Sequence, residues 1–407
     1  MIKPKIRFKG YQEEWEQRKL GDMAEFSKGS GYSKGDLIES GTPIILYGRL
    51  YTKYETVISD VDTFVEAKDG SVYSKGGEVI VPASGETAED IARAASVDKS
   101  GILLGGDLNI VMPNEDINSA FLAISISNGS SQRELARKAQ GKSVVHIHNE
   151  EIRNLIVPFP TKAEQNKMEN YFAALDHLIT LHHRKCEETK ILKKYMLQKM
   201  FPQNGNSVPE IRFWGFTEDW EQRKLIDVCD YVDYRGKTPT KTDSGVFLVT
   251  AKNVKDGYID YGASQEYISE DDYEEVMHRG KPEIGDVLIT TEAPCGNVAQ
   301  VNRADIALAQ RIIKYRGQSN IVDNTYLKYY LLSPEFQNIL NAKSSGGTVK
   351  GIKGSILHQQ EIKYPKYEEQ FKIGSYFNNL DHLITLHQKK CDELQNIKKF
   401  MLQNMFI

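Results

Sequence analysis

Two pairs of similar segments, each pair separated by 205 residues, constrain this sequence more than any other feature. P-K-I-R-F-K-G-Y-Q-E-E-W-E-Q-R-K-L at residues 4–20 matches residues 209–225 at 12 of 17 positions. Residues 171–201 match residues 376–406 at 20 of 31 positions. Each half of the chain therefore opens and closes with the same sequence.

The inserts between these blocks, residues 21–140 and 226–345, show little identity. Solenoid units are about 20–50 residues long, so a repeat of this length is not a solenoid. With 407 residues, 40% of them hydrophobic, the chain has room for two to three domains with real cores. We expect a duplicated domain in which the shared frame has one structural role and each insert has its own target.

The second repeated block predicts a long amphipathic helix. Between residues 171 and 201, apolar or semi-apolar side chains recur at steps of three and four, and neither copy contains Gly or Pro. A helix of this length spans roughly 46 Å. Two copies of one unit usually associate about a two-fold axis, which predicts an antiparallel helix pair. The alternative is that each stripe packs separately on its own domain.

The residues expected to pair the two helices lie on this stripe. They are Leu178, His182 and Cys186 in the first copy and Leu383, His387 and Cys391 in the second. The two histidines are interpreted as packed or interfacial rather than catalytic.

The first repeated block predicts a short lead-in to each half. Trp15 and Trp220 are expected to dock against the frame. Arg18 and Lys19, with their copies, are interpreted as a solvated charged face, with phosphate contact as the alternative.

Both inserts have the pattern of a mixed α/β domain, because short apolar runs alternate with Gly-containing loops. The predicted strands are P-I-I-L-Y (43–47), G-E-V-I-V-P (77–82) and L-N-I-V-M-P (108–113) in the first insert, and G-V-F-L-V-T (245–250), G-D-V-L-I-T (285–290) and Q-R-I-I-K-Y (310–315) in the second. Helical periodicity occurs around 116–138 and 324–342.

Five loops in matching parts of the two halves combine small residues, Lys or Arg, and in most cases Tyr: 27–35, 47–54, 234–242, 251–255 and 342–353. Basic groups neutralise phosphate, small residues let the backbone approach it, and Asn, Gln, Ser and Thr can bind base edges. The alternative is that these loops are simply solvated. The candidate DNA-contacting residues are Lys34, Tyr47, Arg49, Tyr51, Lys142, Tyr234, Arg235, Lys237, Thr238, Lys252, Asn253, Lys343 and Lys350.

The net charge of −4 does not exclude a nucleic-acid partner, because local patches matter more than the total. The sequence lacks the common catalytic motifs. A-R-K-A-Q-G-K-S (136–143) resembles a Walker A loop but has Ala136 where the first Gly is required. Neither N-P-P-[FYW] nor D-P-P-Y, the tetrapeptides of amino-methyltransferases, is present.

H-I-H (146–148) has no third metal ligand nearby, and Cys295 is interpreted as a turn residue rather than a nucleophile. We expect a binding protein without a catalytic site, a metal or a cofactor of its own.

Cysteine usage and hydropathy predict a cytoplasmic protein. Cys186, Cys229, Cys295 and Cys391 form no C-x-x-C pair, which is typical of free thiols in a reducing compartment. The first residues contain no apolar signal region, and no run approaches 18 apolar residues.

The whole chain resembles the specificity subunit of type I restriction–modification systems. The resemblance rests on I-R-F-x-G-[YF]-x-x-x-W-E-x-R-K-L opening each half, on E-Q at 164–165 and 369–370, and on L-D-x-L-I-T-L-H in each long helix. The helix block and R-G-K-T-P (235–239) are the most telling pieces.

The resemblance implies that the inserts are target recognition domains, each of which reads one half of a split DNA site. It also implies that the paired helices space these domains and hold two methyltransferase subunits, which bind S-adenosylmethionine and methylate adenine. Motor-nuclease subunits would join them to cut unmodified DNA with ATP and Mg. This chain would supply only the sequence recognition.

The predicted fold is mixed α/β, with two pseudo-symmetric target recognition domains separated by a long antiparallel two-helix coiled coil. The predicted recognition domains, each with its lead-in, are residues 1–160 and 204–365. The predicted spacer helices are residues 161–203 and 366–407. A ~46 Å spacer exceeds one DNA turn of about 34–36 Å, so both domains could reach one duplex. Unlike inserts on a two-fold frame predict an asymmetric site. The rival hypothesis is a two-lobed protein-interaction adaptor without salt-dependent DNA affinity.

Overall fold

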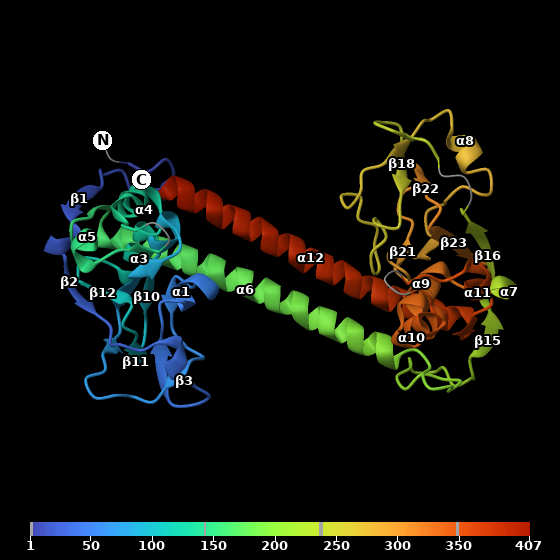
Figure 1. The fold of residues 1–407 in the computed structure, drawn as a ribbon, viewed down its shortest axis with the longest axis horizontal. Helices are drawn as coiled ribbons and strands as arrows, with labels where there is room; N and C mark the ends of the chain where they lie inside the picture. The colour runs from blue at the N-terminus through green and yellow to red at the C-terminus, as the bar shows by residue number, and fades with distance from the viewer. Residues whose placement is uncertain (1–2, 142–143, 236–238, 347–349) are drawn as a thin grey trace. The chain divides into compact units, whose positions relative to one another are not determined.

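The computed structural model describes residues 3–141, 144–235, 239–346 and 350–407 (Figure 1). Contacts group the chain into two compact units. Unit 1 contains residues 1–182 and 389–407, and unit 2 contains residues 183–388. Each unit therefore takes in part of both long helices, as well as one insert.

Unit 1 is built on a five-stranded sheet with the order β2-β12-β8-β10-β5. These strands are β2 (Ala24–Lys28), β12 (Leu108–Pro113), β8 (Glu78–Pro82), β10 (Ala95–Val97) and β5 (Val57–Ile58). Neighbouring strands are antiparallel except for β5, which is parallel to β10. Helix α3 (Ser119–Ile126) packs on β8 and β10 and is followed by α4 (Gly129–Lys138). Phe121, Val79 and Val81 are fully buried in the resulting core.

A second sheet of unit 1 has the order β3-β6-β4-β11-β7. Its strands are β3 (Leu37–Ile38), β6 (Phe64–Val65), β4 (Thr42–Ile45), β11 (Ser100–Leu104) and β7 (Tyr73–Lys75). Ile45 and Leu104 of this sheet share a buried cluster with Ile80 and Ile110 of the first sheet. The two sheets of the insert are therefore held together by apolar side chains.

Unit 2 repeats this arrangement with different residues. Its sheets have the orders β16-β23-β20-β21 and β17-β19-β18-β22. The strands are β16 (Cys229–Asp233), β23 (Ile312–Gly317), β20 (Val287–Thr290), β21 (Val298–Gln300), β17 (Lys241–Thr242), β19 (Tyr267–Ile268), β18 (Val246–Val249) and β22 (Ile306–Leu308). Helix α9 (Asn324–Leu332) packs on β20, β21 and β23, next to α10 (Pro334–Lys343).

The two inserts thus share one topology, although their sequences show little identity. In each main sheet the first strand in the chain pairs with the last: β2 with β12 and β16 with β23. The last strand then pairs with an equivalent inner strand, β8 in unit 1 and β20 in unit 2. A buried strand needs only apolar side chains of suitable volume, so the fold persists while the residues change.

Within the six-residue repeat W-E-Q-R-K-L, the four residues E-Q-R-K form a strand of a two-stranded sheet in each unit. In unit 1, β1 (Glu16–Lys19) pairs antiparallel with β14 (Ile156–Phe159). In unit 2, β15 (Glu221–Lys224) pairs with β24 (Glu361–Tyr364) in the same way. The preceding tryptophans are 4% and 5% exposed, which confirms that the aromatic residue docks on the frame. The strand residues themselves are exposed, as expected for a solvated charged face.

The repeated E-Q pair ties the lead-in to the long helix. Glu164 is 1% exposed and accepts two hydrogen bonds from Arg7, at 2.7 and 2.8 Å. Gln165 accepts the backbone N–H of Asn118 at 2.8 Å and donates to the carbonyl of Pro160 at 2.9 Å. These contacts fix the start of the helix against both the lead-in and α3.

Unit 2 contains the same set of contacts 205 residues later. Arg212 donates to Glu369 at 2.7 and 2.8 Å. Gln370 accepts from the N–H of Asp323 at 2.9 Å and donates to the Pro365 carbonyl at 2.9 Å. The repeated residues therefore have a structural role, which explains why they recur in both halves.

The long helices α6 (Lys162–Lys199) and α12 (Tyr367–Met405) run antiparallel in both units. In unit 1, Lys398 bonds Asp176, and the Cys391 thiol lies 3.6 Å from the Ile179 carbonyl. In unit 2, Lys193 bonds Asp381 at 2.5 Å. Along α6 the partners move backwards along α12, as an antiparallel pair requires.

Each long helix extends beyond the block that predicted it. The 38 residues of α6 span about 57 Å. The helix begins nine residues before the repeated block, within the predicted segment 161–203, because Pro160 and Thr161 set its first turn, and the Thr161 carbonyl accepts the N–H groups of Glu164 and Gln165. Apart from the E-Q pair and one lysine, the first turns differ in sequence between the copies, so the repeated block begins after them.

The predicted helix-pairing residues occupy two kinds of position. Cys186 and Cys391 are 2% and 3% exposed and face the other helix within their own units. His182 and His387 are partly buried. Leu178 and Leu383 are 40% and 41% exposed, so these two leucines lie largely outside the seam between the helices. Their assignment to the seam is corrected, because Ile179 and Ile384, one residue further on, are partly buried in their place, and one residue turns a helix by about 100°.

Candidate nucleic-acid interface

One edge of the main sheet of unit 2 gathers polar side chains from four segments. Strands β16 and β20 end there and β23 begins there, because Asp233 pairs with Ile313 and Thr290 pairs with Ile312. The loops at this edge line a pocket of about 440 Å³. Its lining residues are Arg235, Thr291, Glu292, Gln310, Arg311, Ser345, Gly351, Ile352 and Lys353.

Arg235 follows β16 and is held by a carboxylate. Its Nε donates to both oxygens of Asp233, at 3.0 and 2.9 Å. Hydrogen bonding to Asp233 raises the pKa of Arg235. Burial raises the pKa of Asp233, but the bonds from Arg235 outweigh it and leave this pKa below its ordinary value. Both groups therefore stay charged at neutral pH.

The backbone around Arg235 is also fixed. Arg279 donates to the carbonyl of Asp233 at 2.9 Å and to that of Arg235 at 2.7 Å. Gly354 approaches so closely that a Cβ atom there would lie 2.5 Å from Arg235 Nη2. Since exposed arginines otherwise sample many rotamers, these contacts hold the guanidinium in place before any ligand binds.

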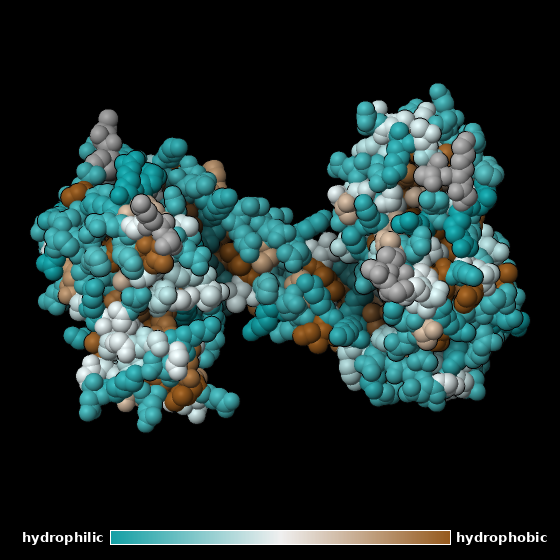
Figure 2. All heavy atoms as spheres, viewed as in Figure 1, coloured by the Kyte–Doolittle hydropathy of each residue, from teal (hydrophilic) through white to brown (hydrophobic). Residues whose placement is uncertain are grey.

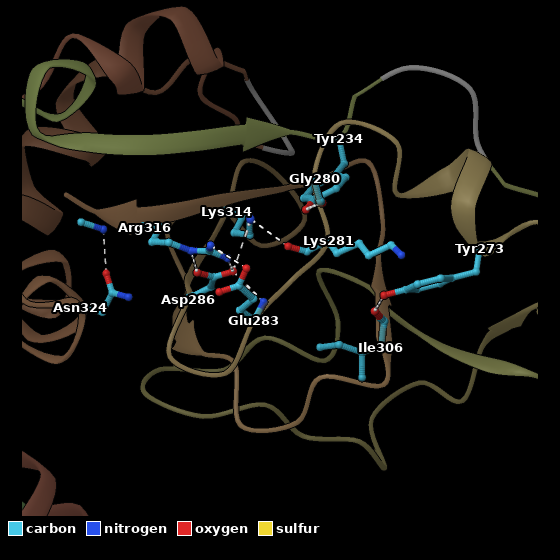
Figure 3. A network of polar contacts seen from close by, with 11 residues as sticks. Tyr234, Tyr273, Gly280, Lys281, Glu283, Asp286, Ile306, Lys314, Arg316 and Asn324 are labelled. Atoms are coloured by element: carbon cyan, nitrogen blue, oxygen red, sulfur yellow. Dashed lines mark hydrogen bonds and ion pairs between the residues drawn. The ribbon is translucent and has the colours of Figure 1, made fainter. Parts of the chain in front are cut away.

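A buried ion network supports the segment that carries Arg279 (Figure 3). Asp286, which is 1% exposed, accepts hydrogen bonds from Arg316 at 2.6 and 2.8 Å and lies 3.3 Å from Lys314 Nζ. Burial raises the pKa of Asp286, but these cations outweigh it and hold that pKa below its ordinary value. Lys314 also donates to the Lys281 carbonyl at 3.0 Å. The network therefore anchors residues 279–286 to strand β23.

Gln310 and Arg311 were not predicted to contact DNA. They precede β23, and Arg311 Nε lies 2.9 Å from Glu292 Oε1, which follows β20. The residues are distant from Arg235 in sequence, and only the order β16-β23-β20 brings all three to one edge. The Q-R pair that opens the predicted strand 310–315 was the available signal, but it does not stand in a loop rich in small residues.

The predicted loop 342–353 reaches the same edge as a hairpin. Ser345 bridges Gly351 with two backbone hydrogen bonds of 2.9 Å, and Gly351 bridges Glu292. Lys343, the last residue of α10, and Lys350 of this loop are exposed. The structure thus brings together two of the predicted loops, around Arg235 and Lys350.

Two other residues of unit 2 that were predicted to contact DNA instead make hydrogen bonds within the protein. Tyr234 is 8% exposed and donates to the Gly280 carbonyl at 2.6 Å. Asn253 is fully buried; its Oδ1 accepts from the Thr250 N–H and its Nδ2 donates to the Asp260 carbonyl, both at 2.9 Å. The prediction of direct DNA contact is corrected for both, because neither side chain reaches the surface. Lys252 is exposed. Lys237 and Thr238 lie outside the described residues.

Unit 1 has an equivalent hairpin with different side chains. Gln140 forms a β-bridge with His146, and these two residues stand 205 positions before Ser345 and Gly351. Strand β13 (Val145–His146) pairs with β9 (Ser84–Gly85). His146 Nδ1 lies 3.1 Å from Ser84 Oγ. The same edge of the sheet is therefore built in both units, but it presents different groups.

The predicted residues of unit 1 are partly committed to internal contacts. The Arg49 side chain is only 8% exposed and donates to Asp62 at 2.9 Å and Glu55 at 2.7 Å. Tyr51 donates to the Ser84 carbonyl at 2.9 Å. Direct contact by Arg49 is corrected to a structural role, since its guanidinium is enclosed. Tyr47 and Lys34 are exposed, and Lys142 lies outside the described residues.

The described part of the chain contains no cluster of three or more His, Cys, Asp or Glu that could hold a metal ion. Burial raises the pKa of Cys229 to about 12 and also raises that of Cys295, so neither thiol is activated. No helix among the residues described is long and apolar enough to cross a membrane.

Comparisons with solved structures identify the fold. The S subunit of a type I restriction–modification system from M. genitalium has a TM-score of 0.60 at 14% identity, and covers 100% of this chain and 99% of that chain. A structure from a study of complex assembly and conformational transition of the type I R-M system has a TM-score of 0.53 at 18% identity, covering 95% and 96%.

Sequence comparisons agree along the whole chain. The type I restriction enzyme MjaVIII specificity subunit of Methanocaldococcus jannaschii is 23% identical over 403 residues, 95% of this chain and 91% of that protein. The putative MjaX specificity subunit of the same organism is 22% identical over 415 residues, with coverage of 95% and 91%.

The family model for the type I restriction modification DNA specificity domain matches twice, at residues 12–190 and 217–396. These two matches take in most of the chain and correspond to its two halves. This chain therefore belongs to the type I restriction–modification DNA specificity family and is a specificity subunit with two DNA specificity domains.

Proposed function

We propose that each unit reads one half of a split DNA site with the edge of its main sheet. The observation that carries this proposal is the edge of unit 2, where Arg235, Gln310 and Arg311 line one pocket beside an exposed hairpin. Arg donates to guanine O6 and N7, and Gln bonds adenine N6 and N7, so this set suits base edges in the major groove.

The DNA site is asymmetric in this proposal. The hairpin of unit 1 presents Gln140 and His146 where unit 2 presents Ser345 and Gly351. Like scaffolds with unlike side chains place readers in equivalent positions and give them different base preferences. Lys34, Tyr47, Lys142, Lys237, Thr238, Lys252, Lys343 and Lys350 remain proposed DNA contacts.

We further propose that two methyltransferase subunits bind the long helices. Exposed apolar residues recur along α6 and α12 at an offset of 205: Leu178 with Leu383, Leu192 with Ile397, and Tyr195 with Phe400. Figure 2 shows apolar side chains at the surface of the paired helices. Exposed apolar patches of this kind typically mark protein interfaces, and duplicated patches suit two copies of one partner.

The chemistry of the complex then belongs to the partners. The methyltransferase subunits would bind S-adenosylmethionine and methylate adenine, and motor-nuclease subunits would cut unmodified DNA with ATP and Mg. This chain would contribute sequence recognition without a catalytic group or cofactor of its own. Such a complex acts on cellular DNA, and we place it in the cytoplasm.

The test is DNA binding by the full chain co-purified with its methyltransferase, measured against a random-sequence duplex library at two salt concentrations. We expect enrichment of one split motif and an affinity that falls as salt rises, because bound phosphates release counterions. A complex that enriches no motif and shows no salt-dependent affinity would identify a protein adaptor instead.

A further inference from the structure

Two arginines that line the same pocket of unit 2 are each paired with a carboxylate. Arg235 is paired with Asp233, and Arg311 is paired with Glu292. The Arg311 and Glu292 side chains are 52% and 47% exposed, so both are open to a ligand. An ion pair as exposed as this one contributes little to stability.

The carboxylate beside each arginine argues against a role in phosphate binding. A phosphate approaching Arg311 would meet the negative charge of Glu292 within the same contact, and the two anions would repel each other. A base edge carries no net charge. The pair therefore favours a neutral, polar partner over the DNA backbone.

The geometry of the pair leaves the right donors available. Glu292 Oε1 lies against the Nε of Arg311. Guanidinium has five N–H donors in a fixed fork, and among the described residues no hydrogen bond engages the two Nη atoms of Arg311, so these can form a bidentate contact. Guanine O6 and N7 are the acceptors that arginine binds in this way, and the contact is the commonest specific one in the major groove.

Glu292 is itself held in place. Its backbone bridges Gly351, and a Cβ atom at Gly351 would lie 3.3 Å from Glu292 Cβ. The N–H of Ile352 donates to the adjacent Thr291 carbonyl at 2.9 Å. A recognition side chain supported by a rigid neighbour loses less entropy on binding and discriminates better.

Lysines at the same edge provide a contrast. Lys343 and Lys350 are exposed, and no ion pair is recorded for either with the residues that the structure describes. Lysine is a compact point charge that suits phosphate but cannot form a bidentate fork. The edge thus divides into paired arginines and exposed lysines.

We propose that Arg311 reads a guanine in the half-site bound by unit 2, and that Glu292 is the positioning residue that orients its guanidinium. This inference rests on the proposed DNA-reading function and adds a specificity-determining residue to it. The half-site of unit 2 accordingly contains a G·C pair whose recognition depends on Arg311.

The test introduces Arg311→Ala and Arg311→Lys into the chromosomal gene and maps methylated adenines by single-molecule sequencing. In both variants we expect the methylated motif to become degenerate at one G·C position of one half-site, where discrimination falls about 5- to 150-fold. The other half-site stays unchanged, which shows that the variant still folds and assembles. Arg303→Ala is the matched control: it removes another exposed arginine–carboxylate pair of unit 2, with Asp305, outside this pocket, and should keep every position of the motif.

Glu292 is tested by a double-mutant cycle. Glu292→Ala should relax the same base pair as Arg311→Ala, and the double variant should be no more degenerate than Arg311→Ala alone, since the two residues act through one contact. Glu292→Gln keeps an oxygen acceptor and should partly restore discrimination. Additive effects at two different base pairs would overturn the positioning role of Glu292.

Binding measurements separate the failure of this inference from failure of the proposed function. If Arg311→Ala weakens binding equally at every sequence and lowers the salt slope by about one, Arg311 is a phosphate anchor and the inference is wrong. The wild-type complex would still enrich a split motif in that case. If the wild-type complex enriches no motif, the proposed function itself fails.

Discussion

A Cβ atom at Gly354 would fall 2.5 Å from Arg235 Nη2 and 2.7 Å from Asp233 Oδ2. At the scale of single residues, the position of the Arg235 side chain thus depends on the lack of a side chain at Gly354. The atoms that would clash are the ends of side chains, so the backbone can stay in place while the arginine moves.

Gly354→Ala is therefore expected to impair recognition more than stability. The free energy of unfolding should change by less than about 1 kcal/mol, while selectivity in the half-site of unit 2 falls. Motif enrichment and chemical denaturation measure the two effects. Gly48→Ala, where a Cβ would meet nothing within 4 Å, serves as the control and should leave both unchanged. Loss of stability without loss of selectivity would contradict the positioning role of Gly354.

Asp286 makes the folding stability of unit 2 depend on pH in the acid range. Its pKa in the folded protein lies below the unfolded value of about 3.9, so its contribution to stability is present above that pH and is lost as the pH falls through the folded pKa. Asp286→Asn should cost about 3–5 kcal/mol at neutral pH, because Lys314 and Arg316 lose their buried partner.

The measurement for Asp286 is urea unfolding between pH 7 and pH 3. The Asn variant should show a shallower loss of stability below pH 4 than the wild type. Asp305→Asn, which removes an exposed pair with Arg303, should follow the wild-type curve. Parallel curves for wild type and Asp286→Asn would show that the network does not control acid stability.

At the scale of elements, the sequence predicted the strands and long helices well and their ends less well. The run 108–113 is β12 as expected, whereas the region 116–138 is two helices, α3 and α4, divided at Ser127 and Asn128. The region 324–342 is likewise divided between α9 and α10 at Ser333, which caps α10 ahead of Pro334. Periodicity continues across such breaks and hides them.

The candidate site was harder to predict because it depends on contacts between distant residues. The loops around Arg235 and Lys350 were found from local composition. Arg49 and Asn253 have the same composition around them but bond partners elsewhere in the fold. Arg311 reaches the edge only through strand order, which composition does not reveal.

The paired lead-in contacts predict matched effects in the two units. Arg7→Ala and Arg212→Ala should each destabilise by about 3–5 kcal/mol, because each leaves a glutamate that is 1% exposed without its cation. Hydrogen exchange, which reports the stability of each unit separately, should assign each loss of stability to the unit that carries the substitution. Arg18→Ala breaks only an exposed pair with Glu16 and should have little effect. Losses spread evenly over both units would contradict this account.

At the scale of the whole molecule, one frame is used twice with different readers. The structural contacts of the frame recur at the same offset, from Arg7 and Glu164 to Arg212 and Glu369. The inserts share strand order but not surface residues. The DNA target can therefore change through the inserts while the shared frame stays the same.

Replacing residues 226–345 by a copy of residues 21–140 should therefore give a functional chain with two identical readers. Because the helices that carry the readers are antiparallel copies, we expect the methylated motif to become an inverted repeat of one half-site. Methylation mapping of the altered strain measures the result. A motif that keeps two different halves would show that specificity resides outside the inserts.

The central claim is that this chain directs methylation to a split, asymmetric DNA site. The most direct measurement is a genome-wide map of methylated adenines in the wild type, in a deletion of this gene and in the complemented deletion. We predict one asymmetric split motif that disappears on deletion and returns on complementation. Persistence of the same methylated adenines in the deletion strain would contradict the account.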